Sequence, residues 1–238
     1  MSLPYRDPCK ACLNCDVRRK AVCSALKDDE VGELERVMSF VKLEANQILL
    51  EEGEPRRRVY SLTSGMLRLS LALPDGRRQI TGFLMPGDFL GLADDDTYSQ
   101  TAEAVIPSGL CSFSVRDMDQ LMERFPHLKD RLHLMTRAAL RQARETQMIL
   151  GRLAPSEKVA SFLLIMSNRA AAHGLPESPV HLPMTRTDIA DYLGLTIETV
   201  SRTFTKLKTQ GLIHLPDPHS VEIADKARLA TVAGITLH

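Results

Sequence analysis

Residues 184–212 read MTRTDIADYLGLTIETVSRTFTKLKTQGL, and this stretch decides the fold of the C-terminal part of the chain. Thr185 followed three residues later by Asp188 is typical of a capping box, so a short helix is predicted to begin there and to end at Gly194. Thr196 can cap a second helix, which a later glycine ends. A short helix, a glycine turn and a second helix form a helix-turn-helix, whose second helix enters the major groove of DNA.

The second predicted helix has two chemically different faces. Its apolar residues repeat at helical spacing and are predicted to pack inward: Ile197, Val200, Phe204 and Leu207. On the opposite side, Arg202 can reach guanine, Glu198 a cytosine amino group and Ser201 a thymine edge. The side chains predicted to contact DNA, with both lysines assigned to phosphates, are Thr185, Arg186, Thr196, Glu198, Thr199, Ser201, Arg202, Thr205, Lys206 and Lys208.

The composition limits the function classes that remain. The chain has 238 residues, enough for two domains, and its 30 Lys plus Arg balance its 30 Asp plus Glu. DNA binding would therefore depend on a local basic face and would be sensitive to salt. No apolar run is long enough to span a membrane and no signal peptide begins the chain, so a soluble, cytoplasmic protein is expected. No Ser/His/Asp order, phosphate loop or paired carboxylates indicates an enzyme.

Four of the five cysteines are crowded near the start of the chain. Residues 8–23 read PCKACLNCDVRRKAVC and hold Cys9, Cys12, Cys15 and Cys23. In a cytosolic protein such crowding favours metal or redox chemistry over a disulfide framework. The spacing suits zinc, which takes four ligands, and it also suits an iron–sulfur cluster, so both stay open. The basic residues 18–20 inside the run are predicted to lower the thiol pKa.

The middle of the chain, residues 41–114, is predicted to be all-β. Residues 66–73 alternate polar and apolar side chains, residues 74–76 turn the chain, and residues 78–84 run back. Short strands punctuated by glycines indicate a small sandwich or barrel-like roll. Taken alone, Cys111 at the end of this region is a small core residue.

Helical patterns follow the β region. Ser114 with Asp117 three residues later predicts the start of a short helix, Pro126 interrupts it, and a long helix covers about residues 128–150. The long helix includes an apolar seam, and a homodimer is the natural partner for it. The residues of this seam are Leu128, Leu132, Met135, Ala139, Gln142 and residues 147–150.

The remaining C-terminal elements surround the helix-turn-helix. Residues 151–155 are predicted to form a hinge, residues 156–172 a helix and residues 174–183 a surface loop. After the helix-turn-helix, residues 212–215 and 221–223 are predicted to form a two-stranded wing. A short helical tail ends the chain.

These motifs together resemble the CRP/FNR family of bacterial transcription regulators, and within it the oxygen-sensing FNR branch. The resemblance covers nearly the whole chain. It rests on Asp75-Gly76 with the QITGF run that follows, on Pro86-Gly87-Asp88, on residues 185–196 and on the Glu-x-x-Ser-Arg pattern at residues 198–202.

The resemblance implies an α+β fold. Its parts are an N-terminal β-roll sensor domain of the cyclic-nucleotide-binding kind, a long dimerisation helix and a C-terminal winged helix-turn-helix. The implied division is a cysteine-rich cluster-binding segment at 1–30, the β-roll at 31–116, the dimerisation helix region at 117–151 and the DNA-binding domain at 152–238.

The resemblance also implies a [4Fe–4S] cluster. FNR-type sensors hold one with three N-terminal cysteines and one at the end of the β-roll, and Cys12-x2-Cys15-x7-Cys23 is similar to the spacing in one bacterial subset of that branch. Cys111 falls at the distant position, which changes its interpretation from a core residue to the fourth ligand. Cys9 is then spare, but Cys9-x2-Cys12 has the same short spacing, so a ligand set with Cys9 as a substitute stays open.

Two regions depart from related patterns. Cyclic-AMP-binding relatives carry a glutamate and an Arg-Ser/Thr pair where this chain reads GLA at residues 91–93 and QTA at residues 100–102, so a cyclic nucleotide ligand is not expected. FNR proteins carry an acid on the dimer helix that repels its symmetry mate when the cluster is absent. Glu145 is the match here, in place of the usual aspartate.

The predicted function is therefore an oxygen-responsive transcription regulator of the FNR type, an activator that binds a TTGAT…ATCAA-like palindrome as a [4Fe–4S]-dependent homodimer at low oxygen. The implied partners are double-stranded DNA, a second copy of the chain and RNA polymerase. The alternative is a clusterless regulator of the same fold that senses zinc, redox state or another signal through its cysteines.

Overall fold

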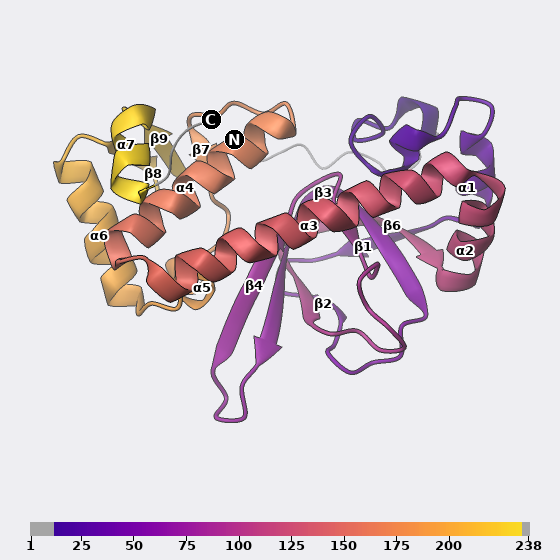
Figure 1. The fold of residues 1–238 in the computed structure, drawn as a ribbon, viewed down its shortest axis with the longest axis horizontal. Helices are drawn as coiled ribbons and strands as arrows, with labels where there is room; N and C mark the ends of the chain where they lie inside the picture. Colours follow the sequence, from indigo (N-terminus) through magenta and orange to yellow (C-terminus); the bar gives the residue numbers. More distant parts are fainter. Residues whose placement is uncertain (1–11, 235–238) are drawn as a thin grey trace. The chain divides into compact units, whose positions relative to one another are not determined.

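The computed structural model describes residues 12–234 of the chain. The chain divides into two compact units, Met1–Arg141 and Gln142–His238, and the boundary falls within one long helix, α3 (Pro126–Arg152) (Figure 1). None of the described helices is both long and apolar enough to cross a membrane. The prediction that Cys9 is the spare cysteine lies outside the described residues.

The N-terminal unit is built on an antiparallel sheet, as the all-β prediction requires. The sheet has six strands, in which β3 and β6 form the centre, β1 and β2 pair with β6, and β4 and β5 pair with β3. Their bounds are β1 (Ser39–Leu43), β2 (Ile48–Leu50), β3 (Arg58–Ala72), β4 (Arg78–Leu84), β5 (Phe89–Leu90) and β6 (Thr101–Ser114). The predicted hairpin is β3–β4, but β3 begins eight residues earlier than predicted, at Arg58 rather than residue 66. Its first half is buried on both faces, so it shows no polar–apolar alternation.

The central strands separate two apolar cores, because successive side chains of a strand point to opposite faces. One face fills the interior of the roll with buried side chains, which are Leu43, Leu50, Tyr60, Leu62, Leu67, Tyr98, Ala102, Ala104 and Leu110. The other face presents Val59 from β3 and Phe113 from β6 to the helices described next.

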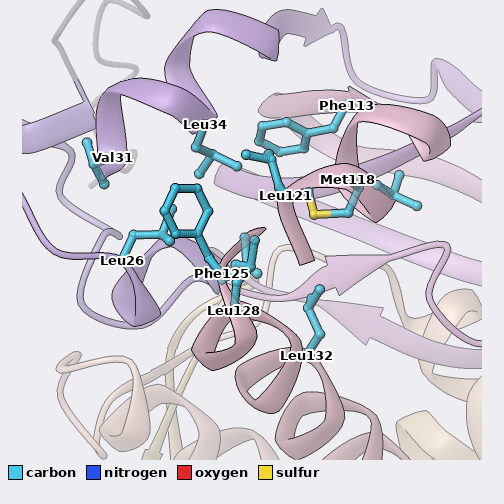
Figure 2. Close-up of a cluster of buried hydrophobic side chains, with 11 residues drawn as sticks. Leu26, Val31, Leu34, Phe113, Met118, Leu121, Phe125, Leu128 and Leu132 are labelled. Carbon is cyan, nitrogen blue, oxygen red and sulfur yellow. The ribbon is translucent and has the colours of Figure 1, made fainter. Parts of the chain in front are cut away.

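Short helical segments cover this second face. They are η1 (Cys12–Asn14), η2 (Val22–Ala25), α1 (Val31–Val37) and α2 (Val115–Arg124). Figure 2 shows Leu34 of α1, Phe113 of β6 and Leu121 of α2 among the side chains of one buried cluster. Each buried side chain of this size contributes about 1.5–3 kcal/mol. The Ser114 hydroxyl accepts a hydrogen bond from the Asp117 N–H at 3.0 Å, which confirms the predicted start of α2.

The helix α3 confirms the predicted long helix but corrects its predicted seam. Leu128 and Leu132 are buried in the second core of their own chain, so these two residues are not available to a second copy, while Met135 is partly buried against that core. Ile149 is likewise buried. The predicted seam is therefore wrong at Leu128, Leu132 and Ile149, because the spacing identifies an apolar face without identifying what covers it. Ala139 and Met148 of the predicted seam are exposed. The large apolar side chains that α3 leaves exposed are Leu134, Leu140 and Met148.

The C-terminal unit is a helical domain with a small sheet. Its helices are α4 (Pro155–Ala172), α5 (Arg186–Leu193), α6 (Ile197–Thr209) and α7 (Lys226–Ala233), and its strands are β7 (Val180–His181), β8 (Ile213–Asp217) and β9 (Ser220–Ile223). The helix-turn-helix, the wing and the helical tail are confirmed. The wing has three strands, in the order β7-β9-β8, rather than the two predicted. The third strand lies in the predicted loop, where neighbouring prolines conceal that Val180 is buried and pairs with Val221.

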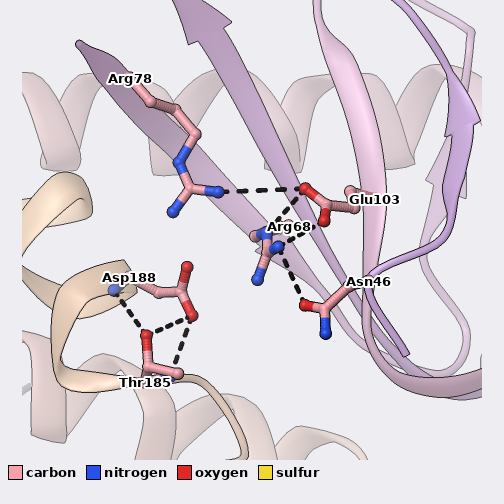
Figure 3. A network of polar contacts seen from close by, with 6 residues as sticks. All are labelled: Asn46, Arg68, Arg78, Glu103, Thr185 and Asp188. Atoms are coloured by element: carbon pink, nitrogen blue, oxygen red, sulfur yellow. Dashed lines mark hydrogen bonds and ion pairs between the residues drawn. The ribbon is translucent and has the colours of Figure 1, made fainter.

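Polar networks supplement both units (Figure 3). In the roll, the Arg68 guanidinium on β3 donates two hydrogen bonds to the Glu103 carboxylate on β6 and one to the Asn46 side chain at 3.2 Å. Bidentate pairs of this kind fix the register of neighbouring strands. In the C-terminal unit, Thr185 and Asp188 form the predicted capping box of α5.

Candidate functional site

Four cysteines from distant parts of the sequence line one cavity. Cys12, Cys15 and Cys23 come from the N-terminal segment and Cys111 comes from β6. We call this the cysteine cavity; its other lining residues are Val17, Ala21, Val22, Leu34, Ser61, Thr63 and Phe113. The fold therefore brings together the four cysteines that the family resemblance implies as ligands.

The position of Cys111 follows from strand geometry. Cys111 lies in β6 between two buried neighbours, Leu110 and Ser112, and pairs with Phe40 of β1 and Ser61 of β3. Leu110 belongs to the interior of the roll, so Cys111 points to the opposite face, the face that also carries Phe113. The N-terminal segment covers that face, which brings its cysteines to Cys111.

A run of tight turns positions the N-terminal cysteines. The carbonyl of Cys12 accepts from the Cys15 N–H at 3.4 Å, the carbonyl of Cys15 from the Arg18 N–H at 3.1 Å, and the Cys23 thiol lies 3.8 Å from the Arg18 carbonyl. The Arg18 side chain spans the loop, since it donates to the Leu26 carbonyl at 3.3 Å and pairs with Asp28 at 2.5 Å. The side chains of Val22 and Leu26 then anchor the segment in the second core.

Burial dominates the electrostatics of the cysteine cavity. It raises the pKa of Cys12, raises that of Cys23 to about 11 and raises that of Cys111 to about 12. Charges on Cys12, Cys15 and Cys23 add to the rise in the Cys111 pKa. Arg18 lowers the pKa of Cys12 and Cys23 as its position in the sequence predicted, but burial outweighs it. Without a cation in the cavity, these three thiols stay protonated at neutral pH.

The spacing of the donors bears on what they can hold. Cys12, Cys15, Cys23 and Cys111 are free thiols, and no disulfide joins them. Across residues 12–234, no three His, Cys, Asp or Glu side chains lie close enough together to hold a single metal ion. Sulfurs around one tetrahedral zinc ion lie roughly 3.8 Å apart, as Zn–S bonds of about 2.3 Å require. Four thiols lining one cavity match the number of donors that a tetrahedral zinc site takes and that a four-cysteine iron–sulfur cluster takes.

The N-terminal segment is also tied to α2 and α3. The Arg131 guanidinium on α3 donates to the carbonyl of Lys20, which lies between Cys15 and Cys23. One ring nitrogen of His127 lies 3.0 Å from the Glu30 carboxylate, and Arg124 at the end of α2 pairs with Glu33 of α1, also at 3.0 Å. Sequence reasoning did not single out these contacts, because they join positions that are far apart in the chain.

The second candidate site is the exposed side of α6. Thr196 caps this helix by accepting from the Thr199 N–H at 3.2 Å, and Gly194 ends α5 at φ +60°, as predicted. Val200, Phe204 and Leu207 are buried, but Ile197 is 41% exposed, so its predicted inward packing is wrong. Ile197 is the first residue of the helix, where no neighbouring turn lies over it. Thr203 is buried in addition.

The polar residues of α6 lie on one exposed side. We call this set the recognition face; it consists of Glu198, Ser201, Arg202, Thr205, Lys206 and Lys208. The pKa of the Glu198 carboxyl is lowered, first by its own backbone N–H, then by the Thr196 hydroxyl and by Arg202 one turn away. The Lys206 ammonium donates to Ser156 at the start of α4 at 3.2 Å. The face thus presents a carboxylate, two hydroxyls and three cations.

The four other predicted DNA-contact residues have partners inside the chain. The Thr185 hydroxyl is engaged with Asp188 in the capping box, and Thr199 with Thr196. The Arg186 guanidinium lies 3.6 Å from the centre of the Phe204 ring, a cation–π contact.

Glu145 is exposed on α3 and lies near α5. Burial raises the pKa of Tyr192 on α5, and the Glu145 charge contributes to that rise. The Tyr192 hydroxyl is 3.1 Å from that of Thr146, the buried residue next to Glu145. Glu145 therefore borders a contact within its own C-terminal unit.

Comparisons with known proteins cover both units. Residues 40–125 match the family of the cyclic nucleotide-binding domain, and residues 157–232 match the Crp-like helix-turn-helix domain. The first match spans the roll and α2, and the second spans the helix-turn-helix and the wing.

Relatives of known name align over almost the whole chain. It is 40% identical over 222 residues to the nitrogen fixation regulation protein FixK of Bradyrhizobium diazoefficiens, covering 93% of each chain. It is 37% identical over 227 residues to the transcriptional activator protein FnrL of Cereibacter sphaeroides, covering 94% of this chain and 92% of that one. Among solved structures, FixK2 from Bradyrhizobium japonicum matches 85% of this chain and 99% of its own, with a TM-score of 0.77 and 33% identity.

Proposed function

Because this chain belongs to the FNR-type branch of the CRP/FNR family of transcription regulators, we propose that it is an oxygen-responsive activator whose DNA binding depends on a [4Fe–4S] cluster. One observation carries the proposal: Cys12, Cys15, Cys23 and Cys111 line one buried cavity although 88 residues separate the last two. Thiolates gathered in an apolar setting are the usual ligands of such clusters.

The cluster would be held by those four cysteines. When bound, it supplies a cationic iron core that neutralises the thiolates and bonds that oxygen attacks. The chain itself supplies the apolar wall, through Val22, Leu34 and Phe113, which limits the access of water. Burial raises the pKa of the Cys23 and Cys111 thiols, so these thiols would lose their protons only when the cationic iron core binds. Binding of the cluster would therefore be coupled to the folding of the N-terminal segment.

The segment can transmit its order to α3. Its side chains share one core with Leu128 and Leu132, and Arg131 holds the carbonyl of Lys20. A segment that loosens would remove contacts from the N-terminal half of α3. A ligand that stabilises one of two states by a few kcal/mol is enough for a switch of this type.

We assign the dimer contact to the exposed side of α3, which keeps Met148 of the predicted seam but not the buried Leu128, Leu132 or Ile149. Leu134, Leu140 and Met148 are each at least 50% exposed. Apolar side chains of this size along one helix are a suitable surface for a second copy. Glu145 lies on the same helix, and two such carboxylates close to a dimer axis would repel each other.

The dimer would present two copies of α6 to DNA. Helices that read half-sites one DNA turn apart explain the symmetry of a TTGAT…ATCAA-like palindrome. Arg202, Glu198 and Ser201 would read bases, while Lys206 and Lys208 would contact phosphates. Activation would proceed through RNA polymerase, the partner that the family resemblance implies.

The clusterless alternative receives less support. Oxidation of a thiol requires its thiolate, and the raised pKa of Cys12, Cys23 and Cys111 keeps these residues protonated. A single zinc ion would require the described sulfurs to come closer together than they lie.

Binding of a labelled palindrome tests the proposed function. The full chain, purified without oxygen, is titrated into a TTGAT…ATCAA duplex and into a duplex with only one half-site, before and after exposure to air. We expect tight binding to the palindrome only without oxygen, and weak binding to the half-site in both conditions. Equal palindrome binding in air and without oxygen would overturn the oxygen response.

A further inference from the structure

One buried hydroxyl in the cysteine cavity lacks a hydrogen-bond partner among the described residues. This hydroxyl belongs to Ser61, whose side chain is only 3% exposed. Leaving a buried hydroxyl without a partner is costly, so native proteins rarely do so unless water, an ion or a ligand completes the bond.

The strand register places Ser61 beside a cluster ligand. Ser61 of β3 is paired directly with Cys111 of the antiparallel neighbour β6. Residues opposite each other on antiparallel strands point to the same face, with Cβ atoms about 4.5–5.5 Å apart. Both side chains line the cysteine cavity, as this geometry requires.

A second hydroxyl in the same cavity provides the contrast. Thr63, two residues further along β3, also lines the cavity, but its hydroxyl donates to the Gly109 carbonyl at 2.8 Å. Of these two hydroxyls, Thr63 already has an acceptor in the protein and Ser61 has none among residues 12–234.

We propose that Ser61 donates a hydrogen bond to sulfur of the bound group, either the Cys111 thiolate or a sulfide of the cluster. The inference rests on the proposed cluster and adds a residue that tunes it. A hydrogen bond to sulfur withdraws electron density, which raises the reduction potential and makes the iron–sulfur bonds harder to oxidise. Ser61 would thus set how readily the protein responds to oxygen.

The test compares Ser61→Ala with Thr63→Val in the full-length protein. Each is purified without oxygen, reconstituted with iron and sulfide, and assayed for iron content, midpoint potential and the rate of absorbance loss after a measured addition of oxygen. We expect normal iron content in both variants. Ser61→Ala should have a lower potential and lose its absorbance on the order of tenfold faster, while Thr63→Val should match the parent in both.

Two further readouts exclude a merely structural role. Exchange into D2O should shift the iron–sulfur stretching bands of the parent and of Thr63→Val in resonance Raman spectra, through the hydroxyl proton, and should shift them less in Ser61→Ala. In the metal-free protein, Ser61→Ala should unfold at the same or a higher temperature than the parent, because it removes a hydroxyl without a partner.

The outcomes separate this inference from the proposed function. A parent protein that takes up no iron and sulfide would overturn both. If the parent takes up iron and sulfide but Ser61→Ala has the same midpoint potential, the same rate of absorbance loss and the same D2O shift as the parent, only the Ser61 hydrogen bond would be overturned. A metal-free Ser61→Ala protein that melts at a lower temperature would also overturn it, because the hydroxyl would then have a partner within the protein.

Discussion

The cysteine cavity and the recognition face place their functional groups in opposite environments. The cavity collects partly buried thiols from segments far apart in the sequence, and burial raises the pKa of three of them. The recognition face is one exposed side of the 13-residue helix α6, and the pKa of its Glu198 carboxyl is lowered.

The difference shows how the two sites depend on the fold. The cavity exists only when β6, α1 and the N-terminal segment are packed together, so a ligand bound there acts on the packing itself. The recognition face requires only that α6 be folded and presented, so changes there alter DNA contacts without altering the core. A site built by packing, such as the cysteine cavity, suits the sensing of a ligand, whereas an exposed helix face, such as the recognition face, suits contact with DNA.

Loss of a cavity ligand should have the largest effect. Cys111→Ser is expected to lower the iron content by at least about tenfold and to abolish palindrome binding, because the proposed cluster would lose the one ligand that the roll supplies in the proposal. Iron assays and DNA titrations without oxygen measure both. Cys9→Ser is the control and should behave like the parent. If Cys9→Ser loses iron and Cys15→Ser keeps it, Cys9 would replace Cys15 in the proposed ligand set. Full palindrome binding by Cys111→Ser would contradict the proposed role of the cysteine cavity.

Loss of a core side chain on α3 should have the next largest effect. Leu128→Ala is expected to lower the free energy of unfolding of the metal-free protein by about 2–5 kcal/mol, since Leu128 is fully buried. Urea denaturation measures the change. Leu134→Ala, on the same helix but 56% exposed, should change it by no more than about 0.5 kcal/mol. Equal losses would mean that the two sides of α3 are not distinct.

A change on the recognition face should leave the core intact. Arg202→Ala is expected to weaken palindrome binding by about 1–3 kcal/mol and to relax specificity at one base pair, with unchanged iron content and unfolding. Lys208→Ala should weaken binding to all duplexes alike, because the proposal assigns Lys208 to a phosphate. Competition with single-base variants of the palindrome distinguishes these effects. Parent-like binding by Arg202→Ala would remove α6 as the reading element.

The smallest expected effect is at Glu145. Glu145→Ala should raise the dimer fraction in air, by about 1 kcal/mol or less for an exposed pair of like charges. Sedimentation measures it. An unchanged monomer fraction would assign the Glu145 charge to its contact region near Tyr192 rather than to a dimer brake.

Local signals predicted the C-terminal site well. The capping residues Thr185 and Thr196 and the glycine turn at Gly194 act within a few residues, so the sequence contains the whole cause of the structure there. Ile197 was wrongly predicted to be buried, because apolar periodicity does not show that the first turn of a helix has no neighbouring element packed over it. The strand β7 was missed because its pairing with β9 is not local.

Residues of the N-terminal site could be named from the sequence, but their environment could not. The cysteine spacing and the family resemblance identified Cys111, whereas its burial depends on the alternation of β6 and on what covers that face. The same limit explains why Leu128 was wrongly assigned to the predicted seam, since an apolar residue can pack against its own core or against a second copy. Ser61 carried no signal, because its significance comes from its register with Cys111.

Counting iron and sulfide in protein purified without oxygen tests the central claim most directly. The claim predicts about four iron and four sulfide per chain, as a [4Fe–4S] cluster requires, with loss of both and of palindrome binding on exposure to air. One zinc per chain, or full palindrome binding by protein that contains no iron, would contradict it.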